Sequence, residues 1–223
     1  MLFVACVASG AGSLRVAPVR LDLPQDRRAV ALTVTNTGNS STLMQLDLKR
    51  WSQAAGNDDY SAADDLIVSP PIFTLDAGAE QVVRVGRRTA GQPAKEVAYR
   101  LFVQEVPTPG SITSPSELNV VLRIGIPIFA TPPNAPQAEV EWALQCREGS
   151  SAVLVAMNRG GRALRIDELK VHAAGSDHTE RAVYVLAGAT RAFLLSDLPA
   201  SARRVELTGQ SPQQKIQGAA ACD

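Results

Sequence analysis

Residues 118–130 read LNVVLRIGIPIFA, and they form the most informative stretch of the sequence. Aliphatic side chains take every second position, which predicts a β-strand with one unbroken apolar stripe: Leu118, Val120, Leu122, Ile124, Ile126 and Ile128. The positions between them are not apolar throughout, as they would be in a strand buried on both faces. Pro127 has no N–H to donate, so it belongs at a sheet edge or a strand end. An edge strand with such a stripe invites aggregation unless a partner covers it.

Short alternating segments rich in Val, Leu and Thr recur along the 223 residues, with turn residues between them. No run of about ten residues shows a helical period with caps at both ends. This pattern is typical of an all-β sandwich or barrel. The strands expected in the first half are 14–23, 29–36, 42–52, 66–69, 72–75, 79–87, 98–106 and 118–129. Those expected in the second half are 140–145, 152–157, 163–172, 182–186, 192–195 and 203–208.

A proline-rich connector, TPPNAP at 131–136, separates two periodic regions and predicts two domains, 14–130 and 137–223. The start, MLFVACVASGAGS at 1–13, resembles the apolar core and cleavage zone of a secretory signal, although the charged region that precedes such a core is missing. We therefore expect a partial signal peptide and an exported protein. No other segment reaches the roughly 18 apolar residues that a membrane span needs, so stable membrane insertion is not expected.

Charge and motifs exclude several classes of function. The chain has 22 basic and 22 acidic residues, and no basic excess favours nucleic-acid binding. His172 and His178 flank a turn without convergent partners, and no nucleophile elbow, P-loop or zinc-helix motif is present. We therefore expect no enzyme, no metal site and no cofactor.

The cysteines predict one disulfide. Cys6 lies in the expected leader, which leaves Cys146 and Cys222 as an even pair in an exported protein. Their bridge would close a loop of about 75 residues and contribute about 4 kcal/mol in the chain-entropy model. It would stabilise the second half alone.

A set of motifs in the first half gives a family resemblance. In chain order they are PVRLDL at 18–23, LTVTN at 32–36, SPPIF at 69–73, LDAG at 75–78, QVVRV at 81–85 and YRLFVQEVP at 99–107. In this order and spacing, residues 14–130 resemble the PapD-like periplasmic chaperones of pilus (fimbrial) assembly. The resemblance implies two immunoglobulin-like β-sandwich domains in a boomerang arrangement. It also implies a periplasmic location, pilin subunits as clients and an outer-membrane usher that receives them.

The resemblance also gives the exposed strand a role. Pilin subunits lack one strand of their sandwich, and the chaperone lends its last N-domain strand, a form of β-strand addition. The donor side chains would be Leu118, Val120, Leu122 and Ile124. Each buried aliphatic side chain would contribute about 1.5–3 kcal/mol. The alternative is that the stripe faces the core of its own sandwich. A self-capping homodimer would protect the same edge in the free protein.

The family also binds the carboxylate at the pilin C-terminus with a pair of basic residues. Arg20 takes the place of the first-strand arginine, but Pro127 stands where the best-known members have a lysine. The chain thus looks more like the divergent, archaic-type branch. Arg100 or Arg123 would substitute for the lysine, through a fork that suits a carboxylate. Alternatively, these arginines only decorate a solvated face.

Two rival interpretations remain. A secreted structural or adhesive β-sandwich protein, such as a pilin-like subunit, would need an alternating apolar extension at its start, and residues 1–13 do not alternate. An exported ligand-binding or hydrolytic protein would need site motifs that the sequence lacks.

Overall fold

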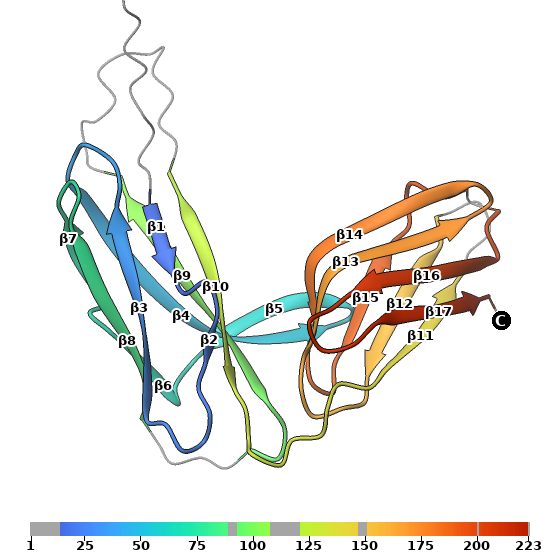
Figure 1. Ribbon diagram of the computed structural model, residues 1–223, viewed down its shortest axis with the longest axis horizontal. Coiled ribbons are helices and arrows are strands. Elements are labelled where there is room, and N and C mark those ends of the chain that lie inside the picture. Colours follow the sequence, from blue (N-terminus) through green and yellow to red (C-terminus); the bar gives the residue numbers. More distant parts are fainter. Residues whose placement is uncertain (1–13, 89–92, 108–120, 147–150, 200, 223) are drawn as a thin grey trace, which may run out of the picture. The chain divides into compact units, whose positions relative to one another are not determined.

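The computed structural model describes residues 14–88, 93–107, 121–146, 151–199 and 201–222. Every regular element in these ranges is a β-strand (Figure 1), which confirms the all-β prediction. The strands form two compact units. The first comprises Met1–Lys49, Ala62–Gly91 and Tyr99–Phe129, and the second comprises Arg50–Ser61, Gln92–Ala98 and Ala130–Asp223. The expected signal segment at 1–13 lies outside the described residues. Within the described ranges, no helix is long and apolar enough to cross a membrane.

The first unit is built on two sheets. One has the order β1 (Leu14–Ala17), β3 (Ala29–Asn36), β8 (Glu80–Arg87) and β6 (Leu66–Ser69). The other has the order β2 (Leu21–Asp22), β10 (Arg123–Ala130), β9 (Val97–Val106), β4 (Thr42–Ala54) and β5 (Asn57–Ala62), with β7 (Ile72–Leu75) paired to β4. Residues 50–54 of β4, 57–61 of β5 and 97–98 of β9 belong to the second unit. Alternation produces the core, because Leu32 on β3 and Val83 on β8 face inward as register partners and are 1% and 0% exposed.

The strand expected at 14–23 is two strands in different sheets. β1 pairs antiparallel with β3, whereas β2 pairs parallel with β10. Pro18 lies between them and supplies no N–H for a ladder, so continuous pairing through this point is disfavoured. The segment therefore contributes one short strand to each sheet of the unit.

The expected strand at 118–129 is observed as β10 from Arg123 to Ala130, while residues 118–120 lie outside the described residues. β10 is largely open on one side (Figure 1). β9 lies on one side of β10. On the other side, β2 pairs only at Ile128 with Leu21 and at Phe129 with Asp22. From Arg123 to Pro127, the described residues supply no ladder partner on this side. Pro127 thus lies where the open stretch ends, as its missing N–H predicted.

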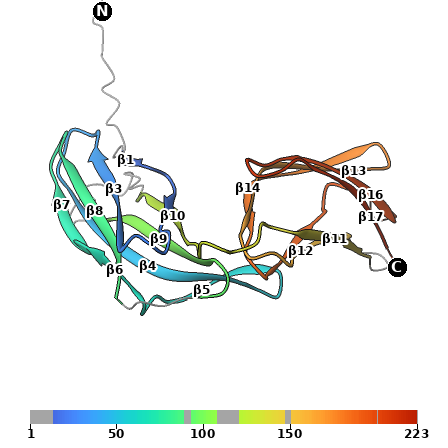
Figure 2. The same ribbon diagram turned by 60° about the horizontal axis from the view of Figure 1, so that its bottom comes forward.

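The second unit is also a two-sheet sandwich. One sheet contains β11 (Val140–Gln145), β12 (Val153–Asn158) and β15 (Thr190–Leu194). The other contains β14 (Ser176–Val185), β13 (Leu164–Ala173), β16 (Arg204–Gln210) and β17 (Ile216–Ala221). Figure 2 shows β13, β16 and β17 in one layer and β11 and β12 in the other. A disulfide joins Cys146, after β11, to Cys222, after β17, with 5.8 Å between their Cα atoms. It therefore links the two sheets.

Two features of the second unit hold segments from elsewhere in the chain. The turn between β4 and β5 lies against β15, where the Ala192 amide donates to the Gly56 carbonyl at 2.9 Å. Gly56 has a φ of +82°, and a Cβ there would lie 2.5 Å from the Ala192 Cβ, so only glycine fits.

Hydrogen bonds also fix the connector at 131–136. Gly161 donates its amide to the Pro136 carbonyl, and Arg162 donates through Nε to the Ala135 carbonyl.

A buried asparagine organises a loop junction in the first unit. Asn36, which is 1% exposed, ends β3. Its Nδ2 donates to the carbonyls of Ser40 at 2.7 Å and Leu75 at 3.0 Å, while its Oδ1 accepts from the Gly38 amide at 2.9 Å. One side chain thus satisfies backbone groups from two separate segments, as a buried polar group must.

The second unit repeats this junction. Asn158, 2% exposed, ends β12 and donates to the carbonyls of Arg162 at 2.8 Å and Val185 at 3.1 Å. Its Oδ1 accepts from the Gly160 amide at 2.9 Å. The spacing Asn-x-Gly, with a carbonyl partner four residues after the asparagine, is the same in both units. The two sandwiches therefore use the same local solution at equivalent strand ends.

Candidate functional site

The two faces of the sheet formed by β9 and β10 differ sharply. On β9, Tyr99, Leu101 and Val103 lie in the core and are at most 1% exposed. The alternate residues Arg100 and Phe102 therefore occupy the opposite face. That face also carries the odd-numbered residues of β10 and the side chain of Arg20, as the contacts below establish. We call it the arginine face, defined by Arg20, Arg100 and Arg123.

Arg123 lies at the start of β10 and is exposed. Its guanidinium carbon is 4.0 Å from the centroid of the Phe102 ring on β9. A guanidinium at this distance is attracted to the ring face. The cation is therefore held over the Phe102 ring, although Arg123 stays exposed to solvent.

Arg100 lies further along the same face, opposite Gly125. Its Nη1 donates to the Gly125 carbonyl at 3.4 Å. A Cβ at position 125 would lie 3.1 Å from the Arg100 Cδ and 3.4 Å from the Phe102 ring. Gly125 therefore leaves the space that the Arg100 side chain occupies. This explains why a residue without a side chain stands among the large residues of β10.

Arg20 lies near the other end of β10. Its guanidinium carbon is 4.5 Å from the centroid of the Phe129 ring, which is fully buried. Its Nε and Nη2 also donate to Oδ1 of Asp22, at 3.0 and 2.8 Å. The sequence predicted the arginine but not its carboxylate partner. Residues two apart on an extended chain share a face, and this spacing is the signal by which Asp22 could have been found from the sequence.

The structure thus brings the three predicted arginines to one face of one sheet, spread along β10. Arg123 lies at its start, Arg100 beside Gly125, and Arg20 beside Phe129. Phe102 and Phe129, which support two of them, were not identified from the sequence.

The predicted donor residues fall into two groups. Leu118 and Val120 lie outside the described residues. Leu122 and Ile124 are partly buried and share the face of Ile126 and Ile128, which are 2% and 0% exposed. The C-terminal end of the stripe therefore packs in the core of its own sandwich. The alternative interpretation expected such packing for the whole stripe. The burial decreases toward Leu122, the residue before β10.

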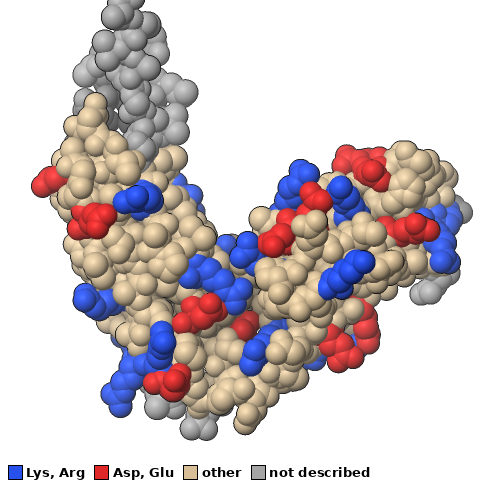
Figure 3. Space-filling view, viewed as in Figure 1, with Lys and Arg blue, Asp and Glu red and all other residues tan. Residues whose placement is uncertain are grey.

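The surface charges are mixed. On the face shown in Figure 3, acidic and basic side chains alternate without an extended patch of one sign. The pKa of Glu168, on β13, is held below its usual value by a hydrogen bond from Arg181, with a further contribution from Lys170.

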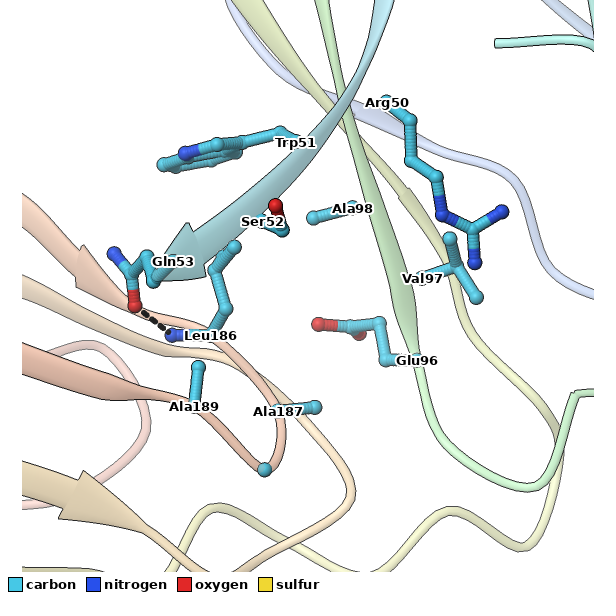
Figure 4. A pocket seen from close by; sticks show the side chains of 11 residues that line it. Arg50, Trp51, Ser52, Gln53, Glu96, Val97, Ala98, Leu186, Ala187 and Ala189 are labelled. Carbon is cyan, nitrogen blue, oxygen red and sulfur yellow. Dashed lines mark hydrogen bonds between the residues drawn. The ribbon is translucent and has the colours of Figure 1, made fainter. Parts of the chain in front are cut away.

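The second unit contains a cavity of about 290 Å³ (Figure 4), lined by residues 50–53, 96–98 and 186–189. Two of its polar side chains, Gln53 and Glu96, hold neighbouring backbone and side-chain groups. Gln53 accepts from the Leu186 amide at 3.0 Å, and Glu96 accepts from the Ala163 amide at 2.8 Å and from Thr131 Oγ1 at 2.6 Å. These contacts fix loops.

The histidines are also engaged. His172 contacts Asp177 at 2.6 Å, and the two ring nitrogens of His178 contact Asp197 and Glu180 at 2.9 and 3.1 Å. Since the latter carboxylates lie on opposite nitrogens of one ring, they do not converge on a common point. Among the described residues, no group of three or more His, Cys, Asp or Glu is placed to hold a metal ion.

Comparison with known proteins gives consistent matches. The family of pili and flagellar-assembly chaperones, PapD N-terminal domain, matches residues 13–136. The uncharacterized fimbrial chaperone YcbF of Escherichia coli K12 is 25% identical over 134 residues, which are 59% of this chain and 56% of that protein. The chain thus matches just over half the length of this curated relative.

Solved structures share the whole fold. A chain of the CsuC–CsuE chaperone–tip subunit pre-assembly complex, from archaic chaperone-usher Csu pili of Acinetobacter baumannii, superimposes with a TM-score of 0.74 at 23% identity, covering 95% of this chain and 99% of that one. The E. coli chaperone DraB superimposes with a TM-score of 0.64 at 20% identity, covering 94% and 97%. At these identities the likeness establishes the two-domain fold.

Proposed function

Because the chain belongs to the PapD-like family of pili and flagellar-assembly chaperones, we propose that it is a periplasmic chaperone that holds pilin subunits by donor-strand complementation. It then delivers them to an outer-membrane usher. The family is one of non-enzymatic chaperones, and its match at 13–136 favours this role over that of a pilin-like structural subunit. The archaic-type branch remains our assignment, supported by the shared fold of the Csu structure.

The open edge of β10 is the observation that carries this proposal. Between Arg123 and Pro127 the strand has backbone available for pairing, and its inward face continues the apolar row of Ile126 and Ile128. A client strand that pairs with this edge would extend the sheet. The apolar row of β10 would then serve two cores. Ile126 and Ile128 pack in the chaperone, and the residues before them on the same face would pack in the client.

The free energy expected from the donor side chains is large enough to hold a client. Four donor side chains, Leu118, Val120, Leu122 and Ile124, would contribute on the order of 6–12 kcal/mol before the cost of ordering the complex. Backbone hydrogen bonds along the paired edge would add to this. Such a sum is enough to hold a subunit whose own sandwich lacks a strand.

The arginine face would bind the C-terminal carboxylate of the client. Pro127 is buried in β10 and has no side-chain donor, so the anchor must come from elsewhere. Arg123, Arg100 and Arg20 all lie on the face adjoining the open edge. An arginine binds a carboxylate through two parallel hydrogen bonds, which would fix the register of the client strand.

The open edge also requires protection when no client is bound. A second copy of the chain that pairs its own β10 against this edge would cover it, giving a self-capping homodimer. Client binding and dimerisation would then exclude each other, because both use the backbone between Arg123 and Pro127.

Co-purification tests the function as a whole. The chaperone, expressed with a pilin subunit from the same organism and isolated from the periplasm, should carry that subunit at a ratio of one to one. A subunit that stays soluble and folded to the same extent without the chaperone would contradict the proposal.

A further inference from the structure

One arginine of the proposed anchor already holds a carboxylate. Arg20 donates through Nε to both carboxylate oxygens of Asp22, at 3.0 and 3.3 Å, and through Nη2 to Oδ1 at 2.8 Å. An arginine binds the carboxylate at the end of a peptide chain through the same guanidinium donors. The Asp22 carboxylate therefore occupies the position that a ligand of this chemistry would take.

The fold imposes this contact. Leu21 is 3% exposed and points into the core, so its neighbour Asp22 points to the arginine face. Asp22 is also the register partner of Phe129, and Arg20 lies over the Phe129 ring. Both members of the ion pair are thereby placed beside Phe129. The pair is built into the short parallel pairing of β2 with β10.

The pair is also easily displaced. The side chains of Arg20 and Asp22 are 30% and 61% exposed, and ion pairs this open to solvent change an equilibrium by only about 1.4- to 5-fold. A client carboxylate on a strand already paired with β10 would outcompete this contact. Strand pairing has already positioned the carboxylate, so its binding to Arg20 costs little further entropy.

From this geometry we propose that Asp22 is an internal competitor for the client carboxylate, which occupies Arg20 in the free protein and is displaced on binding. The inference rests on the proposed function and deepens it. It assigns to Asp22 a regulatory role: it weakens capture of any chain whose carboxylate is not also positioned by strand pairing at β10, and so favours clients that engage both sites.

The sign of one substitution separates this role from a positioning role. If Asp22 competes, Asp22→Asn removes the competing carboxylate from Arg20 and strengthens binding of the client carboxylate. If Asp22 instead orients Arg20 for its ligand, the same substitution weakens binding. Asparagine keeps the shape of the side chain, so pairing of β2 with β10 is retained in either case.

The experiment uses the full chain and a fluorescent synthetic peptide of alternating valine and threonine that ends in a free carboxylate, together with the same peptide as its C-terminal amide. Dissociation constants are measured by fluorescence polarisation for the wild type, Asp22→Asn, Arg20→Ala and Arg20→Ala/Asp22→Asn. Asp26→Asn, which removes an exposed carboxylate in the following turn, is the charge-matched control.

We expect Asp22→Asn to bind the acid peptide about 2- to 5-fold more tightly and the amide unchanged, with no gain in the Arg20→Ala background and none for Asp26→Asn. If Arg20→Ala weakens acid binding while Asp22→Asn leaves it equal or weaker, the competitor role is wrong and the anchor stands. If Arg20→Ala has no effect on binding of the acid peptide, Arg20 is not part of the anchor and the competitor role of Asp22 is wrong. If neither peptide binds any variant, the proposed open-edge function itself is contradicted.

Discussion

The guanidinium of Arg123 lies 4.0 Å from the ring centroid of Phe102, so a cation on β10 is held in place by the neighbouring strand β9. If this contact positions the anchor, replacing the ring should weaken carboxylate binding without touching the arginine. We expect Phe102→Leu to weaken binding of a client with a free C-terminal carboxylate by about 2- to 5-fold, the worth of an exposed cation–π contact. Titration calorimetry measures the change.

A double-mutant cycle provides the control for that prediction. Arg123→Ala should weaken binding at least as much as Phe102→Leu, and the double variant should lose no more than Arg123→Ala alone. Fully additive losses would show that the ring acts on the client separately from Arg123.

The relation between Gly125 and Arg100 gives a second prediction. A Cβ at position 125 would lie 3.1 Å from the Arg100 Cδ, so Gly125→Ala should push the arginine from its observed place. We expect client affinity to fall to the level of Arg100→Ala, with the free energy of unfolding changed by no more than about 1–1.5 kcal/mol. An unchanged affinity for Gly125→Ala, beside a loss for Arg100→Ala, would refute this positioning.

The paired asparagines predict separable effects on the two units. Asn36→Ala and Asn158→Ala each leave buried backbone groups without a partner, and each should lower the free energy of unfolding of its own unit by about 2–3 kcal/mol. Both tryptophans, Trp51 and Trp142, lie in the second unit, and the Trp51 ring centroid is 5.5 Å from that of Tyr184, so their fluorescence reports on the packing of that unit.

Urea titrations followed by fluorescence and by circular dichroism distinguish the two substitutions. Asn158→Ala should shift the fluorescence midpoint, whereas Asn36→Ala should shift only the dichroism. The exposed Asn57, whose side chain contacts the Ala55 carbonyl at 3.3 Å, supplies a matched control with an expected change below about 0.5 kcal/mol on mutation to alanine. A fluorescence shift with Asn36→Ala would contradict the assignment.

The disulfide gives a prediction for the second unit. The link between Cys146 and Cys222 spans 76 residues, and its removal by Cys146→Ser/Cys222→Ser should cost about 4 kcal/mol in the chain-entropy model. The tryptophan-detected midpoint should fall, and reducing agent should have the same effect on the wild type. If the midpoint stays unchanged on reduction, the link does not stabilise this unit.

Strand alternation allowed much of this fold to be predicted, and particular elements show where the pattern fails. β5, with the sequence NDDYSA, is exposed along its whole length, so no apolar period marks it. β17 reads IQGAAA; four of its six residues are Gly or Ala, and the strand pairs with β16. Both strands exist because a neighbouring strand supplies backbone partners, and the composition of the segment itself carries no sign of this.

The candidate site was also predicted only in part from the sequence. Alternation identified the stripe from Leu118 to Ile128, but it could not tell which members lie in the parent core, since all share one face. The structure places Ile126 and Ile128 there and leaves Leu122 and Ile124 partly exposed. The resemblance located the arginines, whereas their aromatic supports and the Asp22 carboxylate depend on pairing across β9, β10 and β2.

The binding of a pilin subunit by Leu122→Glu tests the central claim most directly. Leu122 is the described donor residue that immediately precedes β10, and a charge there would enter the apolar groove of the client. Ile67→Glu places the same charge on an exposed residue of β6 in the other sheet and serves as the control. Urea midpoints verify that both variants are folded. We predict that Leu122→Glu loses at least about 100-fold in affinity, a lost aliphatic contact plus a buried charge, while Ile67→Glu binds like the wild type. Equal binding by a folded Leu122→Glu protein would contradict the account.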